Sequence, residues 1–254
     1  MIKKVIYENS LGKLIFDGRK MYCQSIDCNG NSVSSTTEQL FNSHGQRTIS
    51  RYFNAKTIPC SFLLADLDDN HALRHRIVEI LNPIITGTLT VQTEHGTYSI
   101  DCYPSESSSF KRSEVNYCYL WNVDFVADFP FWRKGVQNAV QLAINSGTTT
   151  IQAFTVPDTP SILEFDASGG ARVFNVNGKS ISLRSYSTKI IVDTYTYRIK
   201  DANGNDCGNI LDVTQTIDDI LFQPGSNTAY YAASSSGASG NVTIKWYDLV
   251  TGVF

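Results

Sequence analysis

The stretch YCYLWNVDFVADFPFWR, residues 117–133, alternates aromatic and aliphatic residues with polar ones from Tyr117 to Ala127. The alternation places Trp121 and Phe125 on one face of the segment. A period of two is typical of a β-strand that buries one face, because successive side chains in a strand point to opposite sides. We therefore predict a principal core strand of a mainly β domain here.

A hairpin is predicted just before this strand. Leu89 and Val91 alternate with threonines, Glu94-His95-Gly96 has the composition of a turn, and the alternation resumes at Tyr98 and Ile100. Two alternating runs joined by a short turn are expected to pair in antiparallel fashion.

One amphipathic helix is predicted among the strands. Asp68 or Asp69 can cap its start, Leu73 and Ile77 belong to an apolar stripe, and Asn82-Pro83 ends it. A short helix with a single apolar face should pack on a sheet.

The same segment carries two patterns that resemble metal sites. His71 and His75 are four residues apart, which on a helix places both imidazoles on one face, but no glutamate follows His71 and the neighbouring arginines repel a cation. Asp66, Asp68 and Asp69 resemble the start of a calcium loop, yet a histidine stands where the EF-hand needs glycine. We therefore predict no metal site and no cofactor, and we interpret these residues as a solvated helix face and its cap.

The second half of the chain contains two Asn-Gly dipeptides, Asn177-Gly178 and Asn203-Gly204, each beside a strand-like alternation. Asn-Gly is favoured in two-residue hairpin turns of type I′, which need positive φ at both positions. The last alternation places Val242, Ile244 and Trp246 on one face. Several short strands joined by turns predict an all-β sandwich.

A change in composition separates the two halves. After Arg133 the chain is rich in Gln, Asn and Thr from Gln137 to Thr150, and prolines follow. We interpret this segment as a connection between domains. The predicted division is a first domain of residues 1–136 and a second of residues 137–254, with the boundary anywhere between 134 and 160.

The formal net charge of −3 leaves no excess of Lys and Arg to neutralise phosphates. Tight nucleic-acid binding is not expected, although a channel through which DNA slides is compatible with this charge. No run of about 18 apolar residues is present, and the first residues are not those of a signal peptide, so we expect no membrane contact and assembly in the cytoplasm. The six cysteines are scattered, which favours free and mostly buried thiols over disulfides.

The sequence lacks the local motifs of common catalytic sites. No G-x-S-x-G elbow, P-loop or G-x-G-x-x-G follows a predicted strand, and no C-x-x-C pair is present. We therefore predict that the chain is not an enzyme and has no catalytic residue. A glycosidase nevertheless needs only two carboxylates across a groove. Tyr230, Tyr231 and Trp246 could also offer rings to a sugar, although aromatic residues on alternating strands mostly belong to a core.

Several segments together resemble the distal tail protein family of siphophages, which have long non-contractile tails. The most specific is the corner Ala127–Arg133, in which a proline, an aromatic residue, a tryptophan and an arginine follow the aromatic strand. Further segments support it by their order along the chain: Ile58-Pro59-Cys60, Leu81-Asn82-Pro83, Gly87–Thr90, Ile190–Thr194 and Gln223–Asn227. The resemblance is densest between residues 45 and 135, and residues 137–160 are not matched by it.

The resemblance implies an N-terminal β-rich, split-barrel-like domain with one helix that forms a hexameric ring, and a C-terminal galectin-like β-sandwich outside it. A structural role is expected for Pro130, Phe131, Trp132, Arg133 and Trp121, with Trp132 buried where the aromatic strand leaves the first domain. Deletion from about residue 137 onward should then leave the ring intact.

The partners that the resemblance implies are further copies of the chain, the tail tube protein, the tail hub or tail-associated lysin and, in some members, a receptor-binding protein. DNA would pass through the lumen without specific binding. The chain would be a virion protein at the distal end of the phage tail, where its ring joins the tube to the host-adsorption apparatus.

Three functions are compatible with these observations, and they differ in what they require. A tail-tip ring component requires a closed oligomer without a ligand. A carbohydrate-binding module for host-surface attachment requires a concave aromatic face, and a glycan-active enzyme requires a carboxylate pair beside a groove. The ordered set of resembling segments favours the ring component.

Overall fold

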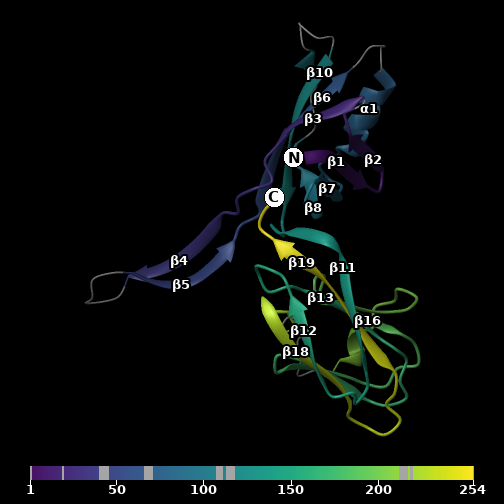
Figure 1. Cartoon of the computed structure of the whole chain (residues 1–254). Helices are drawn as coiled ribbons and strands as arrows, with labels where there is room; N and C mark the ends of the chain where they lie inside the picture. The colour runs from purple at the N-terminus through teal and green to yellow at the C-terminus, as the bar shows by residue number, and fades with distance from the viewer. Residues whose placement is uncertain are drawn as a thin grey trace. The chain divides into compact units, whose positions relative to one another are not determined.

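The structure is a computed structural model that describes residues 2–18, 20–39, 46–65, 71–106, 111–112, 118–211, 217 and 220–253. Its contacts divide the chain into two compact units, residues 1–134 together with 251–254 and residues 135–250. Both units are built mainly of strands (Figure 1). The mainly β class predicted from the alternation of apolar residues is therefore confirmed. The last residues of the chain lie in the first unit, whereas the predicted second domain included them.

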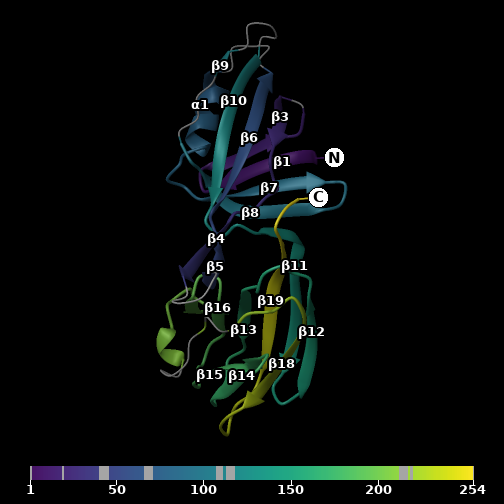
Figure 2. The same ribbon diagram turned by 90° about the vertical axis from the view of Figure 1, so that its left-hand side faces the viewer.

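The first unit contains two crossing sheets, one helix and a separate hairpin. In chain order its elements are β1 Ile2–Asn9, β2 Gly12–Phe16, β3 Met21–Ile26, β4 Val33–Gln39, β5 Gln46–Phe53, β6 Lys56–Ala65, α1 His71–Ile80, β7 Gly87–Thr93, β8 Thr97–Pro104, β9 Lys111–Arg112, β10 Cys118–Ala127 and the first residues of β11 Trp132–Ala143. Strands β2, β1, β7 and β8 pair in that order, as do β3, β6 and β10, and β8 also pairs with β10 at Phe125 and Val126. Figure 2 shows the strands of these two sheets crossing each other.

The predicted aromatic strand is the centre of this unit. It is confirmed as β10, which pairs with β6 along its whole length, from Cys118 opposite Ala65 to Ala127 opposite Lys56. Tyr117 lies outside the described residues. The alternate side chains of both strands are buried, namely Trp121, Val123 and Phe125 on β10 and Ile58, Cys60, Phe62 and Leu64 on β6. Burial of each large apolar side chain stabilises the fold by roughly 1.5–3 kcal/mol, so this strand pair contributes much of the core.

The predicted hairpin and helix are also confirmed. Strands β7 and β8 pair across a tight turn, in which the N–H of Thr93 donates to the carbonyl of Gly96 over 2.8 Å. Helix α1 buries Ile77 and Ile80, and the amide of Asn9 donates to the carbonyl of Ile80 over 2.7 Å, which satisfies a free group at the helix end. The aspartates expected to cap the helix start lie outside the described residues. In the described part of the chain, no helix is long and apolar enough to span a membrane.

The second unit is a sandwich of two sheets. Its elements are the remainder of β11, then β12 Thr148–Ala153, β13 Ser161–Phe165, β14 Arg172–Val176, β15 Lys179–Leu183, β16 Ile190–Asp193, β17 Arg198–Asp201, the 3-10 helix Gly208–Ile210, β18 Gly225–Ala233 and β19 Asn241–Val250. One sheet has the order β17, β16, β13, β19, β11, and the other has the order β12, β18, β14, β15. Phe165, Phe174 and Tyr231 are fully buried between them, with Phe165 and Tyr231 ring centroids 5.7 Å apart. The all-β sandwich predicted from the turn spacing is confirmed.

The two Asn-Gly dipeptides have different structures. Asn177 and Gly178 have φ of 52° and 83° and connect β14 to β15, as a type I′ turn requires. At the second dipeptide only Gly204 has positive φ, and the chain returns to β17 through a single bridge. The prediction of a two-residue hairpin is wrong there, because the carboxylate of Asp201 accepts the N–H groups of Asn203 and Asn205 and closes a longer loop.

The Gln-, Asn- and Thr-rich segment was predicted to connect two domains, but it forms strands of the second unit. Strand β11 continues through it to Ala143, and β12 follows after a short turn. Within residues 137–150 only Leu142 is buried, so polar residues occupy the solvent-facing positions. A half-exposed strand with this composition cannot be distinguished from a loop by hydrophobic periodicity.

Candidate functional site

A two-stranded hairpin forms an arm that extends away from the sheets of the first unit (Figure 1). The arm consists of β4 and β5, which pair from Val33 opposite Phe53 to Gln39 opposite Gln46. Within the described residues these strands pair with each other and with no other strand. An isolated two-stranded hairpin is only marginally stable in water, so the arm is expected to gain stability from a partner surface.

The arm exposes four large apolar side chains. Their exposed fractions are 52% for Val33, 60% for Ile49, 57% for Tyr52 and 41% for Phe53. Ile49 lies at a β-bulge, since the strand register shifts between Thr36 and Thr37. Apolar groups gathered on a protruding strand pair are typical of an interaction site, because free strand edges and apolar surface both favour association.

The base of the arm is held by a polar network centred on Asn54. The backbone N–H of Asn54 donates to the carbonyl of Ser32 over 3.0 Å, and its side-chain amide donates to the Ser32 hydroxyl over 3.1 Å. The Ser34 hydroxyl donates to the Asn54 side-chain oxygen over 2.9 Å. We call the segments Asp27–Ser32 and Asn54–Lys56 the arm root. This network fixes where both arm strands leave the sheets.

The predicted corner contacts the arm and its root. Trp132 is fully buried, and its Nε1–H donates to the carbonyl of Cys28 in the arm root over 3.1 Å. The Phe131 ring meets the Phe53 ring at the end of β5 edge-on, with centroids 4.9 Å apart. Pro130 is buried and sets the direction of the chain before these rings. Three of the residues expected to be structural are therefore brought together at the base of the arm.

The side chains of Arg133 and Trp121 make their contacts away from the arm root. The Arg133 guanidinium forms two hydrogen bonds with the Asp101 carboxylate, which also accepts the Thr88 hydroxyl over 2.9 Å. A bidentate pair of this kind fixes β11 beside β8. Trp121 packs in the core against Phe62, at a centroid distance of 5.5 Å, and takes no part in the root.

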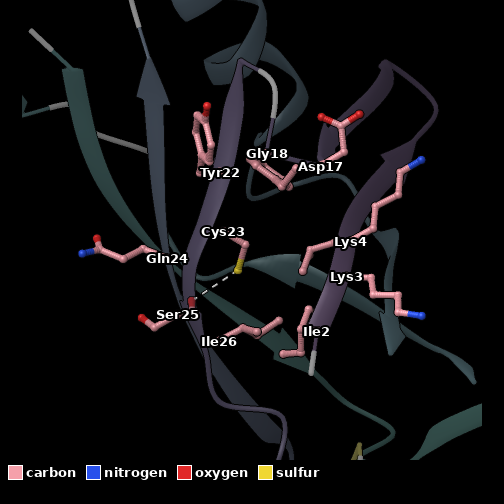
Figure 3. A pocket seen from close by; sticks show the side chains of 12 residues that line it. Ile2, Lys3, Lys4, Asp17, Gly18, Tyr22, Cys23, Gln24, Ser25 and Ile26 are labelled. Carbon is pink, nitrogen blue, oxygen red and sulfur yellow. Dashed lines mark hydrogen bonds between the residues drawn. The ribbon is translucent and has the colours of Figure 1, made fainter. Parts of the chain in front are cut away.

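A second candidate surface is a groove of about 370 Å³ between β1 and β3 (Figure 3). Ile2 and Lys4 line it from β1, and Cys23 and Ile26 line it from β3. Among the described residues β3 pairs with β6 alone, and the pairing of β1 with β2 begins only at Val5. The groove is thus bounded by unpaired strand edges, which an extended segment of another chain can join by backbone hydrogen bonds.

Cys23 and Cys28 are poorly suited to act as nucleophiles. All six are free, and five of them are buried. Burial raises the pKa of Cys23, in the groove, to about 11 and that of Cys28 to about 12. A thiol with such a pKa stays protonated at neutral pH and is a poor nucleophile.

Asp66, Asp68 and Asp69 lie outside the described residues, and the other sequence candidates do not assemble into a site. The rings of His71 and His75 lie 6.4 Å apart, and no group of three metal-ligating side chains occurs in the part of the chain that the structure describes. Tyr231 is fully buried and Trp246 is 7% exposed, which confirms their interpretation as core residues. Only Tyr230, at 37% exposure, keeps an accessible ring in this trio.

Reasoning from the sequence overlooked the arm. Residues 33–39 and 46–53 contain three Thr together with Val33, Ile49, Tyr52 and Phe53, residue types that favour strands, and this composition was the available signal. It gave no apolar alternation because neither face of the arm is buried within the chain.

Solved structures of phage hub and baseplate proteins have a similar fold. The chain is similar over its whole length to the Dit (gp 19.1) protein of phage SPP1, a paradigm of the hub adsorption apparatus in phages that infect Gram-positive bacteria. The TM-score is 0.69 at 13% sequence identity, and the match covers 97% of this chain and 99% of that one. The mainly β, Dit-like fold implied by the sequence resemblance is thereby confirmed.

Two further structures show the same similarity. They belong to the phage P2 baseplate in its activated conformation, one with calcium and one with strontium. Their TM-scores are 0.59 and 0.58 at 11% and 12% identity, and each match covers both chains completely. No protein-family model matches the sequence, and no curated protein matches it.

Proposed function

We propose that the chain is a structural protein of a phage tail tip whose first units form a closed, six-membered ring between the tail tube and the tail-tip hub. The observation that carries this proposal is the whole-length similarity to the SPP1 Dit protein at a TM-score of 0.69. A match that covers 97% of the chain, and so includes both units, supports a shared architecture more strongly than a match to a single sandwich.

The first unit has the surfaces that ring closure needs. A cyclic ring joins two different surfaces of each copy, and the arm and the groove are two such surfaces. The arm brings exposed Ile49 and Tyr52, and the groove brings the free edge of β3. In the proposed ring the arm contacts the first unit of a neighbouring copy, where its strand edges and apolar side chains are covered.

The proposed partners follow from this position. The tail tube protein lies on one side of the ring and the tail hub or tail-associated lysin on the other. The second unit, proposed to be galectin-like, lies outside the ring and is available to a receptor-binding protein. With a formal net charge of −3, the chain is suited to a lumen through which DNA passes without specific binding.

A structural role, and no catalysis, is part of the proposal. It is supported by the raised pKa values of the thiols at Cys23 and Cys28 and by the phage baseplate and hub proteins with the same fold. The alternative of a carbohydrate-binding module has no support from Tyr231 and Trp246, because a buried ring cannot stack on a sugar.

Replacing two arm residues, Ile49→Ser together with Tyr52→Ser, is expected to open the ring and leave the fold intact. Both side chains are more than half exposed, so their loss should change the free energy of unfolding by about 0.5 kcal/mol or less each. In the ring they are buried against a neighbour, where apolar anchors dominate binding. Light scattering should therefore report a monomer whose melting temperature is close to that of the wild type.

A matched control is the pair Val136→Ser and Phe154→Ser in the second unit. These side chains are 84% and 77% exposed, so the chemical change is similar. The control should keep the oligomer of the wild type. If the arm variant kept its full oligomeric mass, or if the control dissociated equally, the arm would not be the ring contact.

A further inference from the structure

The buried ammonium of Lys56 joins the arm root to the end of the chain. Lys56 is 3% exposed, which is unusual for a lysine. Its Nζ donates to the side-chain oxygen of Asn31 in the arm root over 2.9 Å and to the backbone carbonyl of Thr251 over 2.7 Å. Burial lowers the pKa of Lys56 from its usual value, while the neighbouring Cys28 and Asp27 act in the opposite direction.

The residues after β19 belong structurally to the first unit. Residues 251–254 group with residues 1–134, and Gly252 and Val253 are buried. Thr251 directly follows Val250, the last residue of β19. The C-terminal residues 251–253 are therefore continuous with a strand of the second unit but belong to the first unit.

Lys56 couples the positions of residues 251–253 and of the arm root, because it is hydrogen-bonded to both. An ammonium in a buried position is tolerated when its N–H groups have acceptors, and losing one acceptor is costly. If residues 251–253 detach from the first unit, the Lys56 ammonium loses the Thr251 carbonyl as an acceptor. Turning toward solvent then restores its hydration but breaks its hydrogen bond to Asn31. A coupling of this kind acts equally in both directions, so loosening the root must also loosen residues 251–253.

We propose that residues 251–253 act as a strap on the first unit and that the hydrogen bonds of Lys56 couple this strap to the arm root. The direction of the arm then depends on whether the strap is in place. A displacement of β19 loosens the root through the covalent link at Thr251, and fixing the arm secures the strap.

Hydrogen exchange measured by mass spectrometry on the full chain tests this coupling. A chain that ends at Val250 lacks the strap, and Lys56→Met keeps an unbranched side chain close to the length of the aliphatic part but lacks the ammonium. In both, amides of the arm root, residues 27–32 and 54–56, should exchange about tenfold faster or more. Amides of α1 and of the β7–β8 hairpin should keep their wild-type rates. Asn31→Ala should in turn speed exchange at residues 251–253, because Lys56 links Asn31 to Thr251.

Lys13→Met is the matched control, because it removes an exposed lysine from the same unit. It should leave the root and the strap unchanged. Root amides within about twofold of wild type in the chain ending at Val250 would overturn the proposal. So would equally faster exchange throughout the first unit, since that is general destabilisation and not coupling. If Lys56→Met does not fold, the shortened chain and Asn31→Ala still decide the question.

The strap also changes what deletion of the second unit should do. A chain cut at residue 136 loses Thr251 and the buried Val253 from the first unit. The expectation that such a chain keeps an intact ring is therefore revised. A chain in which a short linker replaces residues 135–250 retains the strap and is the appropriate design for an isolated ring unit.

Discussion

Trp132→Ala is expected to destabilise the first unit by about 3–5 kcal/mol, because truncation of a fully buried tryptophan leaves a large cavity. The substitution also leaves the buried carbonyl of Cys28 without its hydrogen-bond donor. The melting temperature of the first unit should fall by roughly 10 °C or more, as measured by calorimetry. Because the Cys28 carbonyl belongs to the arm root, the arm should lose its fixed direction as well.

Trp132→Phe is the matched variant that separates packing from hydrogen bonding. It retains most of the apolar volume and loses the Nε1–H donor, so it should cost about 1–3 kcal/mol. The alanine variant should therefore melt well below the phenylalanine variant. A melting temperature of Trp132→Ala within a degree of the wild type would mean that the corner is not part of the folded core.

Phe165→Ala should destabilise the second unit by a similar amount, about 3–5 kcal/mol. Phe165 is fully buried at the end of β13, and its ring contacts those of Phe174 and Tyr231, with centroids 6.1 Å and 5.7 Å away. The guanidinium of Arg172 also lies over the ring, 5.7 Å from its centroid. Calorimetry should show the transition of the second unit moving to lower temperature.

The two substitutions together test whether the units unfold separately. Each unit has its own core, so each variant should move one transition and leave the other in place. Tyr230→Ala, at a half-exposed ring next to Tyr231, should have little effect on either transition. A shift of both transitions by the same amount in Trp132→Ala and in Phe165→Ala would mean that the chain unfolds as one cooperative body.

The elements predictable from the sequence are those whose burial leaves a periodic pattern. Strand β10 and the β7–β8 hairpin bury alternate residues, and α1 buries a stripe that includes Ile77 and Ile80. The Asn177-Gly178 turn was predictable because type I′ geometry requires positive φ. The burial of Trp132 was predictable, because tryptophan is highly buried on average and this one directly follows a core strand.

The elements that escaped prediction have partners that no local pattern reveals. The arm buries neither face within its own chain, and β11 and β12 carry Gln, Asn and Thr because much of their surface is solvated. Lys56 and Thr251 are separated by 195 positions, and the acceptor is a backbone carbonyl, which leaves no signature in the residue types. The contact between the strap and Lys56 could therefore be identified only from the three-dimensional structure.

Electron microscopy of the purified protein, with light scattering at micromolar concentration, tests the central claim most directly. The proposed ring predicts closed particles with six subunits and an open centre, formed by the protein alone or together with tube and hub proteins. The arm variant Ile49→Ser with Tyr52→Ser should lack these particles while it remains folded. A wild-type protein that stays strictly monomeric under all of these conditions, and that binds glycans on an array, would contradict the ring and support a carbohydrate-binding module.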